Sequence, residues 1–471
     1  MTITELPLPT RRRPGATPTP TSPVVARPEL LPLDAGEQYR FGFSMEACVG
    51  CHSCEAACAE QNGLPDGTAW RRVGEIEGGS FPDTKRFHLS MACNHCIEPA
   101  CLEGCPTEAY IKLDNGIVQH NAYDCIGCQY CTWNCPYSVP AFQPDRRIVT
   151  KCDMCLPRLE EGLTPACVDA CPTFAITVEK VNIEEWRADH SAGNAPNLPD
   201  ASLTLSTTRI TLPKDMPAEM HSGDAWSPRP EHPHWPLVWL TLLTQMAVGA
   251  SATADSGPSR LVAAIAAAAA LAASLLHLGR PAHAWKALRN LRRSWLSREV
   301  ALFGAYGGLA AATVLLPALT PLTVAVGVAG IYASGRLYIV PGRPAWNSPL
   351  TIVRFAATAV AVGPLLTGHA RWAVLGVGLQ VVATVANLVR LRIAGSHEGR
   401  GTLRLSFDWF RIPVIALVAG TLGAGLAAGM GLVIVALPLV ALSELLGRYL
   451  FYVTVVPLDM PGSFSSRMTH L

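Results

Sequence analysis

The chain has 471 residues, with 37 Lys and Arg against 36 Asp and Glu, a formal net charge of +1, and 49% hydrophobic residues. This balance excludes the basic surface typical of nucleic-acid-binding proteins, so we expect no nucleic-acid partner. The mean hydropathy is positive and the long apolar runs all lie beyond about residue 235. We therefore expect a water-soluble half followed by a membrane half.

The first segment, residues 1–37, is rich in proline and threonine and has no apolar periodicity. This composition predicts a disordered tail. Arg11, Arg12 and Arg13 form a basic run, but prolines follow them in place of an apolar stretch. We therefore expect no export signal here.

Residues 38–180 contain all 16 cysteines, in four groups of four. In the third group, CIGCQYCTWNCP, the cysteines stand at offsets 0, 3, 6 and 10, and a proline follows the last. The groups are Cys48, Cys51, Cys54 and Cys58; Cys93, Cys96, Cys101 and Cys105; Cys125, Cys128, Cys131 and Cys135; and Cys152, Cys155, Cys167 and Cys171.

Three kinds of site compete for these cysteines. Disulfide frameworks are typical of small secreted domains, and cysteines so close together in tight loops rarely bridge each other. Paired CxxC units form zinc sites, but a zinc ribbon has no use for a third cysteine at the next +3 position and a fourth before proline. The run C-x2-C-x2-C-x3-C-P is typical of bacterial ferredoxins, where three thiolates hold one cubane and the fourth reaches a second. We therefore predict four 4Fe-4S clusters.

Local features agree with cubane sites. Gly50 and Gly127 allow the backbone to approach the sulfides closely, and a proline follows the fourth cysteine in every group except the first, which has Ala59. Residues 109–120, AYIKLDNGIVQH, predict a β-hairpin between paired clusters. Three aromatic residues are expected either to shield the third cluster or to fill a small core: Tyr130, Trp133 and Tyr137.

The crossed ferredoxin pattern pairs the outer two groups with each other and the inner two with each other. The predicted ligand sets are Cys48, Cys51, Cys54 with Cys171; Cys152, Cys155, Cys167 with Cys58; Cys93, Cys96, Cys101 with Cys135; and Cys125, Cys128, Cys131 with Cys105.

The stretches SMEACVGCHSCEAACAEQN, MACNHCIEPACLEGCPTEAY and DCIGCQYCTWNCPY resemble the four-cluster electron-transfer subunits of molybdopterin oxidoreductases, the dimethyl sulfoxide reductase type among them. The resemblance covers residues 38–180. It implies a separate catalytic subunit that holds a molybdenum or tungsten bis-pterin cofactor. Some relatives replace one cysteine of the second group and hold a three-iron cluster there. Here Cys101 is present, which favours four complete sites.

Residues 181–234 are polar and rich in proline, so we expect a strap over the cluster domain followed by a linker. Eight apolar runs follow, each near the ~20 residues that cross a bilayer as a helix. The runs are 236–254, 260–279, 299–317, 320–340, 349–367, 372–391, 411–429 and 431–453. The predicted fold is α+β followed by all-α: a double ferredoxin-like domain, an eight-helix membrane anchor over 235–457 with both ends on one side, and a tail over 458–471.

Histidine positions test for haem in the anchor. A bis-histidine haem needs two facing imidazoles, and His277 is the only histidine within a predicted span, so we expect no haem. The stretches LLHLGRPAHAWKALRNLRRSWLSREV, LYIVPGRPAWN and SELLGRYLFY resemble the haem-free anchor subunit of dimethyl sulfoxide reductase. This resemblance implies two subunits fused into one chain. The polysulfide reductase and NrfD type of anchor is the alternative.

Ionisable residues within spans are candidates for function. His277 ends the second span and Glu299 begins the third, and the resemblance implies that this pair forms a site for quinol, such as menaquinol. The alternative is a histidine that caps a helix and a glutamate paired with Arg298. Glu444 and Arg448, one helical turn apart in the last span, predict an internal ion pair.

These expectations combine into an electron path. Quinol from the membrane quinone pool would give its protons to His277 and Glu299 and its electrons, through the clusters, to the molybdopterin partner. Three alternatives stay open: a path that runs toward quinone reduction, a redox partner of a cytoplasmic nitrate reductase, and a scaffold with structural clusters. The sequence does not indicate the terminal substrate.

Loops on the cluster side are basic, whereas the opposite loops offer only Arg260 and Arg371. Such a bias marks the cytoplasmic side, so we predict a cytoplasmic (inner) membrane protein whose iron-sulfur domain faces the cytoplasm. The alternatives are that these residues dock carboxylates of the cluster domain, or that the domain faces outward as in the dimethyl sulfoxide reductase type. The residues are Arg280, Lys286, Arg289, Arg292, Arg293, Arg298, Arg343, Arg392, Arg400 and Arg404.

Overall fold

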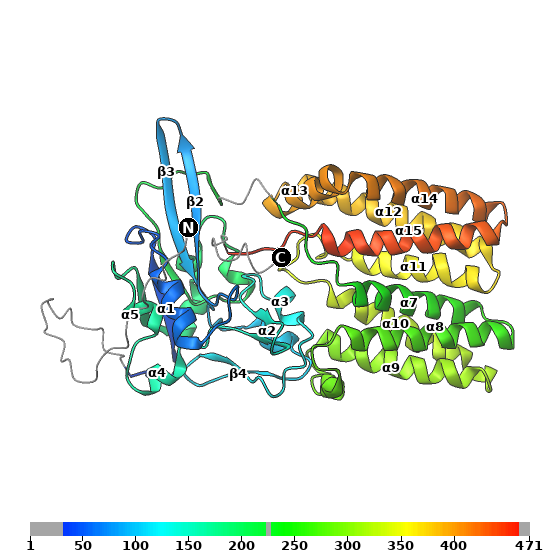
Figure 1. The fold of residues 1–471 in the computed structure, drawn as a ribbon, viewed down its shortest axis with the longest axis horizontal. Helices are drawn as coiled ribbons and strands as arrows, with labels where there is room; N and C mark the ends of the chain where they lie inside the picture. The colour runs from blue at the N-terminus through cyan, green and yellow to red at the C-terminus, as the bar shows by residue number, and fades with distance from the viewer. Residues whose placement is uncertain (1–31, 223–227, 461–471) are drawn as a thin grey trace, which may run out of the picture.

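A computed structural model describes residues 32–222 and 228–460. Figure 1 shows two parts, an α+β domain at the left and a bundle of long helices at the right. Most of the tails predicted over 1–37 and 458–471 lie outside the described residues.

The α+β domain combines short helices with short strands, because the cysteine-rich loops leave few long regular segments. Its helices are α1 (Ser53–Asn62), α2 (Ala100–Gly104), α3 (Tyr130–Asn134), α4 (Leu156–Glu160), α5 (Ala166–Asp169) and α6 (Ile183–Ala188). Its strands are β1 (Glu37–Ser44), β2 (Arg72–Ser80), β3 (Asp83–Met91), β4 (Tyr110–Lys112), β5 (Val118–His120), β6 (Ala141–Gln143), β7 (Ile148–Thr150), β8 (Ile176–Asn182), β9 (Arg209–Thr211) and β10 (Met220–Ser222).

The strands form two three-stranded sheets and two hairpins. Strand β1 runs antiparallel to β8 and parallel to β9, and β2 lies between β10 and β3. The hairpin predicted over 109–120 is confirmed, because β4 pairs with β5 and Tyr110 lies opposite His120. Gly116 adopts the left-handed conformation that this turn needs. The hairpin of β2 and β3 extends well beyond the body of the domain (Figure 1).

The segment predicted as a strap and linker is partly built into the domain. Strand β9 pairs with β1, and β10 pairs with β2. The indole of Trp186 donates a hydrogen bond to the carbonyl of Ser206 within this segment. The segment therefore supplies one strand to each of the three-stranded sheets. Its sequence did not predict these strands, because they are only three residues long and their hydrophobic pattern is weak.

The described part of the membrane half contains eight helices of 17 residues or more: α7 (Trp235–Thr253), α8 (Gly257–Leu276), α9 (Trp295–Thr313), α10 (Thr320–Leu337), α11 (Leu350–Leu366), α12 (Ala370–Ala394), α14 (Arg411–Gly429) and α15 (Val433–Val453). Six segments in this part of the chain are long and apolar enough to cross a membrane. Helix α11, with 17 residues, is shorter than these. Arg298 and Glu299 lower the mean hydropathy of α9, which is not among the six.

Close packing between helices depends on small residues, as is usual in membrane bundles. A Cβ on Gly249 of α7 would lie 1.9 Å from the carbonyl oxygen of Ala359 on α11, and one on Gly363 would lie 2.4 Å from the amide nitrogen of Ala250. Only glycine allows α7 and α11 to approach this closely.

The helical bundle and the α+β domain share one hydrophobic core at their interface. Tyr130 and Trp133 of α3 pack in the same buried cluster as Val238 of α7 and Tyr452 of α15. The start and end of the bundle also meet on this side, because the amide of Glu231 donates to the carbonyl of Val453. The two ends of the helical half thus lie next to the α+β domain, as predicted.

Candidate metal centres and the membrane interface

The four cysteine groups share one backbone bend. The residue before the second cysteine has a positive φ in every group, and these residues are Gly50, His95, Gly127 and Met154. The third cysteine of each group then lies in a short helix, respectively α1, α2, α3 and α5. The CxxC pair of each group therefore folds into the same bend, although the distance along the chain to the third cysteine differs between groups, and two of the bends do not require glycine.

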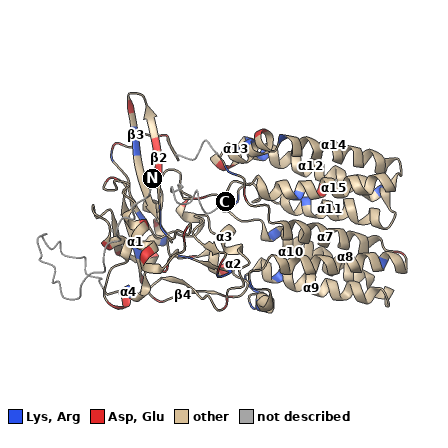
Figure 2. Ribbon diagram, viewed as in Figure 1, with Lys and Arg blue, Asp and Glu red and all other residues tan. Residues whose placement is uncertain are grey.

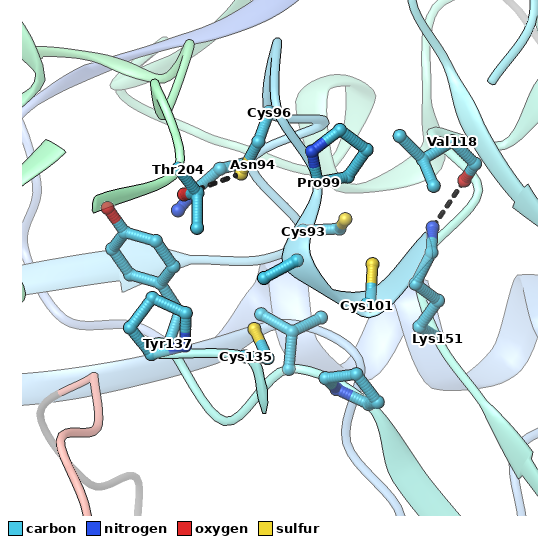
Figure 3. A pocket seen from close by; sticks show the side chains of 14 residues that line it. Cys93, Asn94, Cys96, Pro99, Cys101, Val118, Cys135, Tyr137, Lys151 and Thr204 are labelled. Atoms are coloured by element: carbon cyan, nitrogen blue, oxygen red, sulfur yellow. Dashed lines mark hydrogen bonds between the residues drawn. The ribbon is translucent and has the colours of Figure 1, made fainter. Parts of the chain in front are cut away.

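One predicted ligand set surrounds a single cavity. Cys93, Cys96, Cys101 and Cys135 line a space whose empty volume is about 380 Å³, part of it open to solvent. Figure 3 shows these thiols around that space, with the hydroxyl of Thr204 donating to Cys96 Sγ at 3.2 Å. The structure brings this set together from the second and third groups.

The other three sets also consist of near neighbours. Burial raises the pKa of Cys48, Cys58 and Cys131, and in each case thiols of the same predicted set raise it further. The neighbours are Cys51, Cys54 and Cys171 for Cys48; Cys155 and Cys167 for Cys58; and Cys105, Cys125 and Cys128 for Cys131.

Sites for single metal ions are not found among the thiols that the structure describes. A zinc ion with Zn–S bonds of about 2.3 Å needs its sulfurs roughly 3.8 Å apart. Among the residues that the structure describes, no three His, Cys, Asp or Glu side chains form such a group. The donor set is all thiol, and backbone amides donate to the sulfurs of Cys105 and Cys171 from Ala109 and Ala175. These features fit an iron-sulfur cluster better than mononuclear zinc.

Two buried cations accompany the thiols, and the sequence analysis did not single them out. Arg71 is 2% exposed and Lys151 is 3% exposed. Burial acts to lower the pKa of each, but neighbouring cysteines, led by Cys167 for Arg71 and by Cys93 for Lys151, raise it overall. Nε and one terminal nitrogen of Arg71 have no hydrogen-bond partner among the described residues. Buried positive charge of this kind balances the negative charge of thiolate-ligated clusters.

The loop between α8 and α9 docks onto one ligand set. The amide of Arg280 donates to the carbonyl of Ile126 at 3.0 Å, and Asn290 Nδ2 donates to the carbonyl of Cys105 at 2.9 Å. Ser294 Oγ donates to the carbonyl of Gly104 at 2.7 Å. The contacts converge on residues that neighbour or belong to the set of Cys105, Cys125, Cys128 and Cys131. This set therefore lies nearest to the membrane helices.

His277 lies at the end of α8 and contacts the same ligand set. Its Nε2 is 2.9 Å from the carbonyl oxygen of Cys128, and because a carbonyl only accepts, Nε2 is the donor. Burial lowers the pKa of His277. His234, which precedes α7, lies with its ring centroid 6.1 Å from that of His277, and burial lowers its pKa to about 3. Burial thus disfavours the charged form of both rings.

Glu299 lies near the start of α9, just after its first turn, and is 6% exposed. Its carboxyl group is next to the Ser334 hydroxyl and within electrostatic range of Tyr338 and Tyr452. The alternative pairing with Arg298 does not form, because Arg298 donates to the carbonyls of Leu291 and Arg292 instead.

Aromatic side chains fill the space between His277, Glu299 and α3. The indole of Trp133 lies 5.2 Å from the ring of His234, 5.2 Å from Trp346 and 5.9 Å from Tyr338. Of the three aromatic residues of the third group, Tyr130 and Trp133 pack against membrane helices, whereas Tyr137 belongs to the core of the α+β domain.

The predicted ion pair in the last span is corrected by the structure. Glu444 and Arg448 do not contact each other directly, because the hydroxyl of Thr358 on α11 lies between them. Sequence spacing showed that the two side chains share a face of α15 but could not show that a third helix supplies a bridge.

His234 is the main residue of this region that the sequence analysis missed. The search for histidines was limited to predicted spans, and His234 precedes the predicted span 236–254 by two residues. The HPHWP stretch at 232–236, with two histidines at a span entrance, was the available signal.

Comparisons with known proteins agree with this division of the chain. Residues 84–181 match the family described as a 4Fe-4S dicluster domain, and residues 259–394 match the family described as the DMSO reductase anchor subunit (DmsC). The B chain of the anaerobic dimethyl sulfoxide reductase of Haemophilus influenzae is 37% identical over 177 residues, which are 36% of this chain and 86% of that protein.

Two further relatives match the same part of the chain. The probable anaerobic dimethyl sulfoxide reductase chain YnfG of Escherichia coli is 38% identical over 177 residues, 36% of this chain and 85% of that protein. The B subunit of the sulfite dehydrogenase of Allochromatium vinosum is 38% identical over 155 residues, 28% of this chain and 65% of that protein.

Proposed function

We propose the function of this chain from the premise that it belongs to the family of iron-sulfur B chains of dimethyl sulfoxide reductases and carries an anchor domain of the same enzymes in one polypeptide. The chain is an iron-sulfur electron-transfer protein, and its apolar helices make it a multi-pass membrane protein. It anchors and supplies electrons to a molybdopterin-dependent catalytic partner.

The finer proposal is that the sixteen cysteines hold four 4Fe-4S clusters in the four predicted sets. The cavity lined by Cys93, Cys96, Cys101 and Cys135 and the buried cations Arg71 and Lys151 support it. When bound, such clusters take up and pass on one electron at a time. The chain's own residues hold the clusters, exclude water from them and balance their charge.

Quinol is the proposed membrane substrate, bound beside His277 and Glu299. Its oxidation to quinone releases two electrons and two protons. Neutral His277, with Nε2 committed to the Cys128 carbonyl, offers its other nitrogen as an acceptor, and Glu299 offers a carboxylate. The single observation that carries this proposal is the hydrogen bond from His277 to Cys128, because it joins a candidate proton acceptor to a ligand of the nearest cluster.

The anchor is proposed to carry no haem and to cross the membrane eight times, with α9 and α11 among the spans. His277 and His234 are near each other, but His277 Nε2 bonds the Cys128 carbonyl and Trp133 packs against His234. Glu299 and Arg298 stand at the end of α9 that faces the iron-sulfur domain, so the rest of the helix is apolar enough to cross.

The experiment that tests the quinol site compares two reductants. In the complete complex, His277→Ala and Glu299→Gln should each slow cluster reduction by menaquinol by about 10²-fold, the usual size of a general acid–base contribution. Reduction by dithionite should keep its wild-type rate, because dithionite does not use this site. Arg260→Gln, near the start of α8 at the opposite end of the bundle, serves as the control. Wild-type quinol rates in both variants would contradict the proposal.

A second direction of electron flow has one observation in its favour. The relative from Allochromatium vinosum is named as part of a sulfite dehydrogenase, so electrons in that protein's complex leave the substrate. In this chain, the same site would then reduce quinone. Measuring turnover with quinol plus dimethyl sulfoxide, and with quinone plus sulfite, separates the two.

The iron-sulfur domain is proposed to face the cytoplasm. Figure 2 shows Lys and Arg gathered at the helix ends on the side of this domain. Part of this bias has another cause, because Lys286 and Arg289 both bind Asp124. Arg343 also binds a carboxylate, that of Glu231, whereas Arg292 and Arg293 form no ion pair with any described residue and support the assignment. Protease added to intact spheroplasts should leave the domain uncut, and its digestion while a cytoplasmic marker survives would reverse the orientation.

A further inference from the structure

A second group of ionisable side chains is buried in the helical bundle, apart from the proposed quinol site. Glu444 and Arg448 of α15 are 5% and 2% exposed, and Thr358 of α11 and Gln245 of α7 are fully buried. Placing a charged side chain within a membrane costs free energy, so such side chains are rare and usually have a functional role. The electron path described above uses none of these residues.

Hydrogen bonds join this group into a chain. Arg448 donates to the hydroxyl of Thr358 at 2.9 Å, and that hydroxyl donates to Glu444 Oε2 at 2.7 Å. Arg448 also donates to Gln245 Oε1 at 2.6 Å, and Gln380 donates to the same Glu444 oxygen at 3.4 Å. The hydroxyl of Thr358 can pass a proton to Glu444, whereas Arg448 only orients that hydroxyl, because a guanidinium has no acceptor and keeps its protons.

Unpartnered polar atoms gather at the same place. Among the described residues, Nε of Arg448, Nε of Arg354, Nε2 of Gln245 and Oε1 of Gln380 are buried without a hydrogen-bond partner. Buried polar atoms are nearly always satisfied, and internal water is the usual means. Four such atoms near the Glu444 carboxylate could bind water molecules, which would extend the chain of hydrogen bonds.

A pair of tyrosines connects this group to the proposed quinol site. The hydroxyls of Tyr338 and Tyr452 lie 2.5 Å apart, and both rings are buried. Both are within electrostatic range of Glu299 and of Arg448. Glu444 is eight residues from Tyr452, or about 12 Å along the helix axis.

We propose that Glu444 binds a proton released by the quinol, which reaches it from Glu299 past the Tyr338–Tyr452 pair and through internal water and the hydroxyl of Thr358, while Arg448 stays charged and holds that hydroxyl in place. The proposal rests on the proposed function. Of the two protons of the quinol, one becomes the acid proton of Glu444 and the other leaves at the interface with the iron-sulfur domain, while both electrons pass to the clusters. The Glu444 carboxyl group is buried and hydrogen-bonded to Thr358 and Gln380, so it can hold a proton away from bulk water.

The experiment uses infrared difference spectra of the complete complex in lipid nanodiscs, recorded as menaquinol reduces the clusters. In the wild type, a carboxylic acid C=O band should appear on reduction and should be absent in Glu444→Gln. Thr358→Val removes the bridging hydroxyl at nearly constant volume and should slow the appearance of the band by about tenfold or more, as expected for one lost hydrogen bond. Thr358→Ser keeps the hydroxyl and should preserve the wild-type rate.

Two results would overturn the proposal. One is an unchanged band in Glu444→Gln, even if that variant is less stable to heat, since a purely structural role predicts this outcome. The other is equal rates for Thr358→Val and Thr358→Ser. Dithionite-reduced cluster spectra verify that each variant is folded. A different result would contradict the proposed function itself: menaquinol would then not reduce the clusters of the wild-type protein at all.

Discussion

At the membrane end of the iron-sulfur domain, the carbonyls of Cys105 and Cys128 accept hydrogen bonds from Asn290 and His277 of the helical half. At the far end, Cys51 is exposed, and Val49 and Phe174 beside its set are 60% and 57% exposed. In Figure 1, α2 and α3 lie toward the bundle and α1 and α5 lie away from it. Both ends use the same loop, so the surroundings alone distinguish them.

This difference suits the two cysteine sets, which use the same motif, to two different steps of electron transfer. A set covered by the membrane loop is suited to receive electrons from a site within the bundle, because protein contacts hold the donor close. A set with an exposed thiol and exposed apolar side chains is suited to a partner that docks on it. We therefore expect substitutions at the two ends to interrupt different steps.

The largest expected effect comes from removing one ligand at each end. Cys125→Ser should abolish reduction of the remaining clusters by menaquinol, because the set nearest the membrane is lost. Cys51→Ser should leave much of that reduction intact but stop turnover with the catalytic partner. Each variant should lose up to four of about sixteen irons per chain, as expected for one cubane.

The measurements are iron and sulfide content after anaerobic purification, cluster spectra during reduction by quinol, and turnover driven by quinol. If Cys51→Ser blocks reduction by quinol as completely as Cys125→Ser does, the two ends are not functionally distinct. Zinc in place of iron in the wild type would remove the basis for the comparison.

A smaller effect is expected from the aromatic contact that joins the two halves. Trp133→Leu removes the ring that packs against His234, Trp346 and Tyr338, and should destabilise the protein by up to about 3 kcal/mol. Because these contacts hold α3 against the proposed quinol site, reduction by menaquinol should slow as well.

Tyr137→Leu provides the control, since Tyr137 comes from the same cysteine group but packs in the core of the iron-sulfur domain. It should cost comparable stability yet leave the quinol rate within about twofold, as expected for a distant independent site. The readouts are thermal unfolding and stopped-flow reduction. Equal slowing in both variants would mean that the interface has no specific role.

The smallest effect concerns the far half, where Arg71 lies among Cys54, Cys58, Cys152 and Cys167. A buried cation stabilises the reduced and more negative form of a nearby cluster. Arg71→Met should therefore lower a midpoint potential by on the order of 60 mV, or about 1.4 kcal/mol for one electron. Arg71→Lys should retain most of the wild-type potential. A redox titration followed by electron paramagnetic resonance measures both variants, and equal potentials would show that the charge is not coupled to a cluster.

Much of this protein follows from sequence spacing alone. Cysteine offsets predicted the four groups and their pairing into sets, and apolar runs predicted the helices of the membrane half, because both signals depend on residues close together in the chain. The hairpin over 109–120 followed from an Asp-Asn-Gly turn between alternating residues for the same reason.

Tertiary structure decided the contacts between segments far apart in sequence. The hydrogen bond from His277 to Cys128, the approach of His234 to His277 and the Thr358 bridge between Glu444 and Arg448 each join different elements. Local patterns fix which face of a helix a residue occupies, but the side chain it meets depends on how all the helices pack. For that reason the sequence predicted a direct ion pair in α15, and packing placed a hydroxyl from α11 between its two charges.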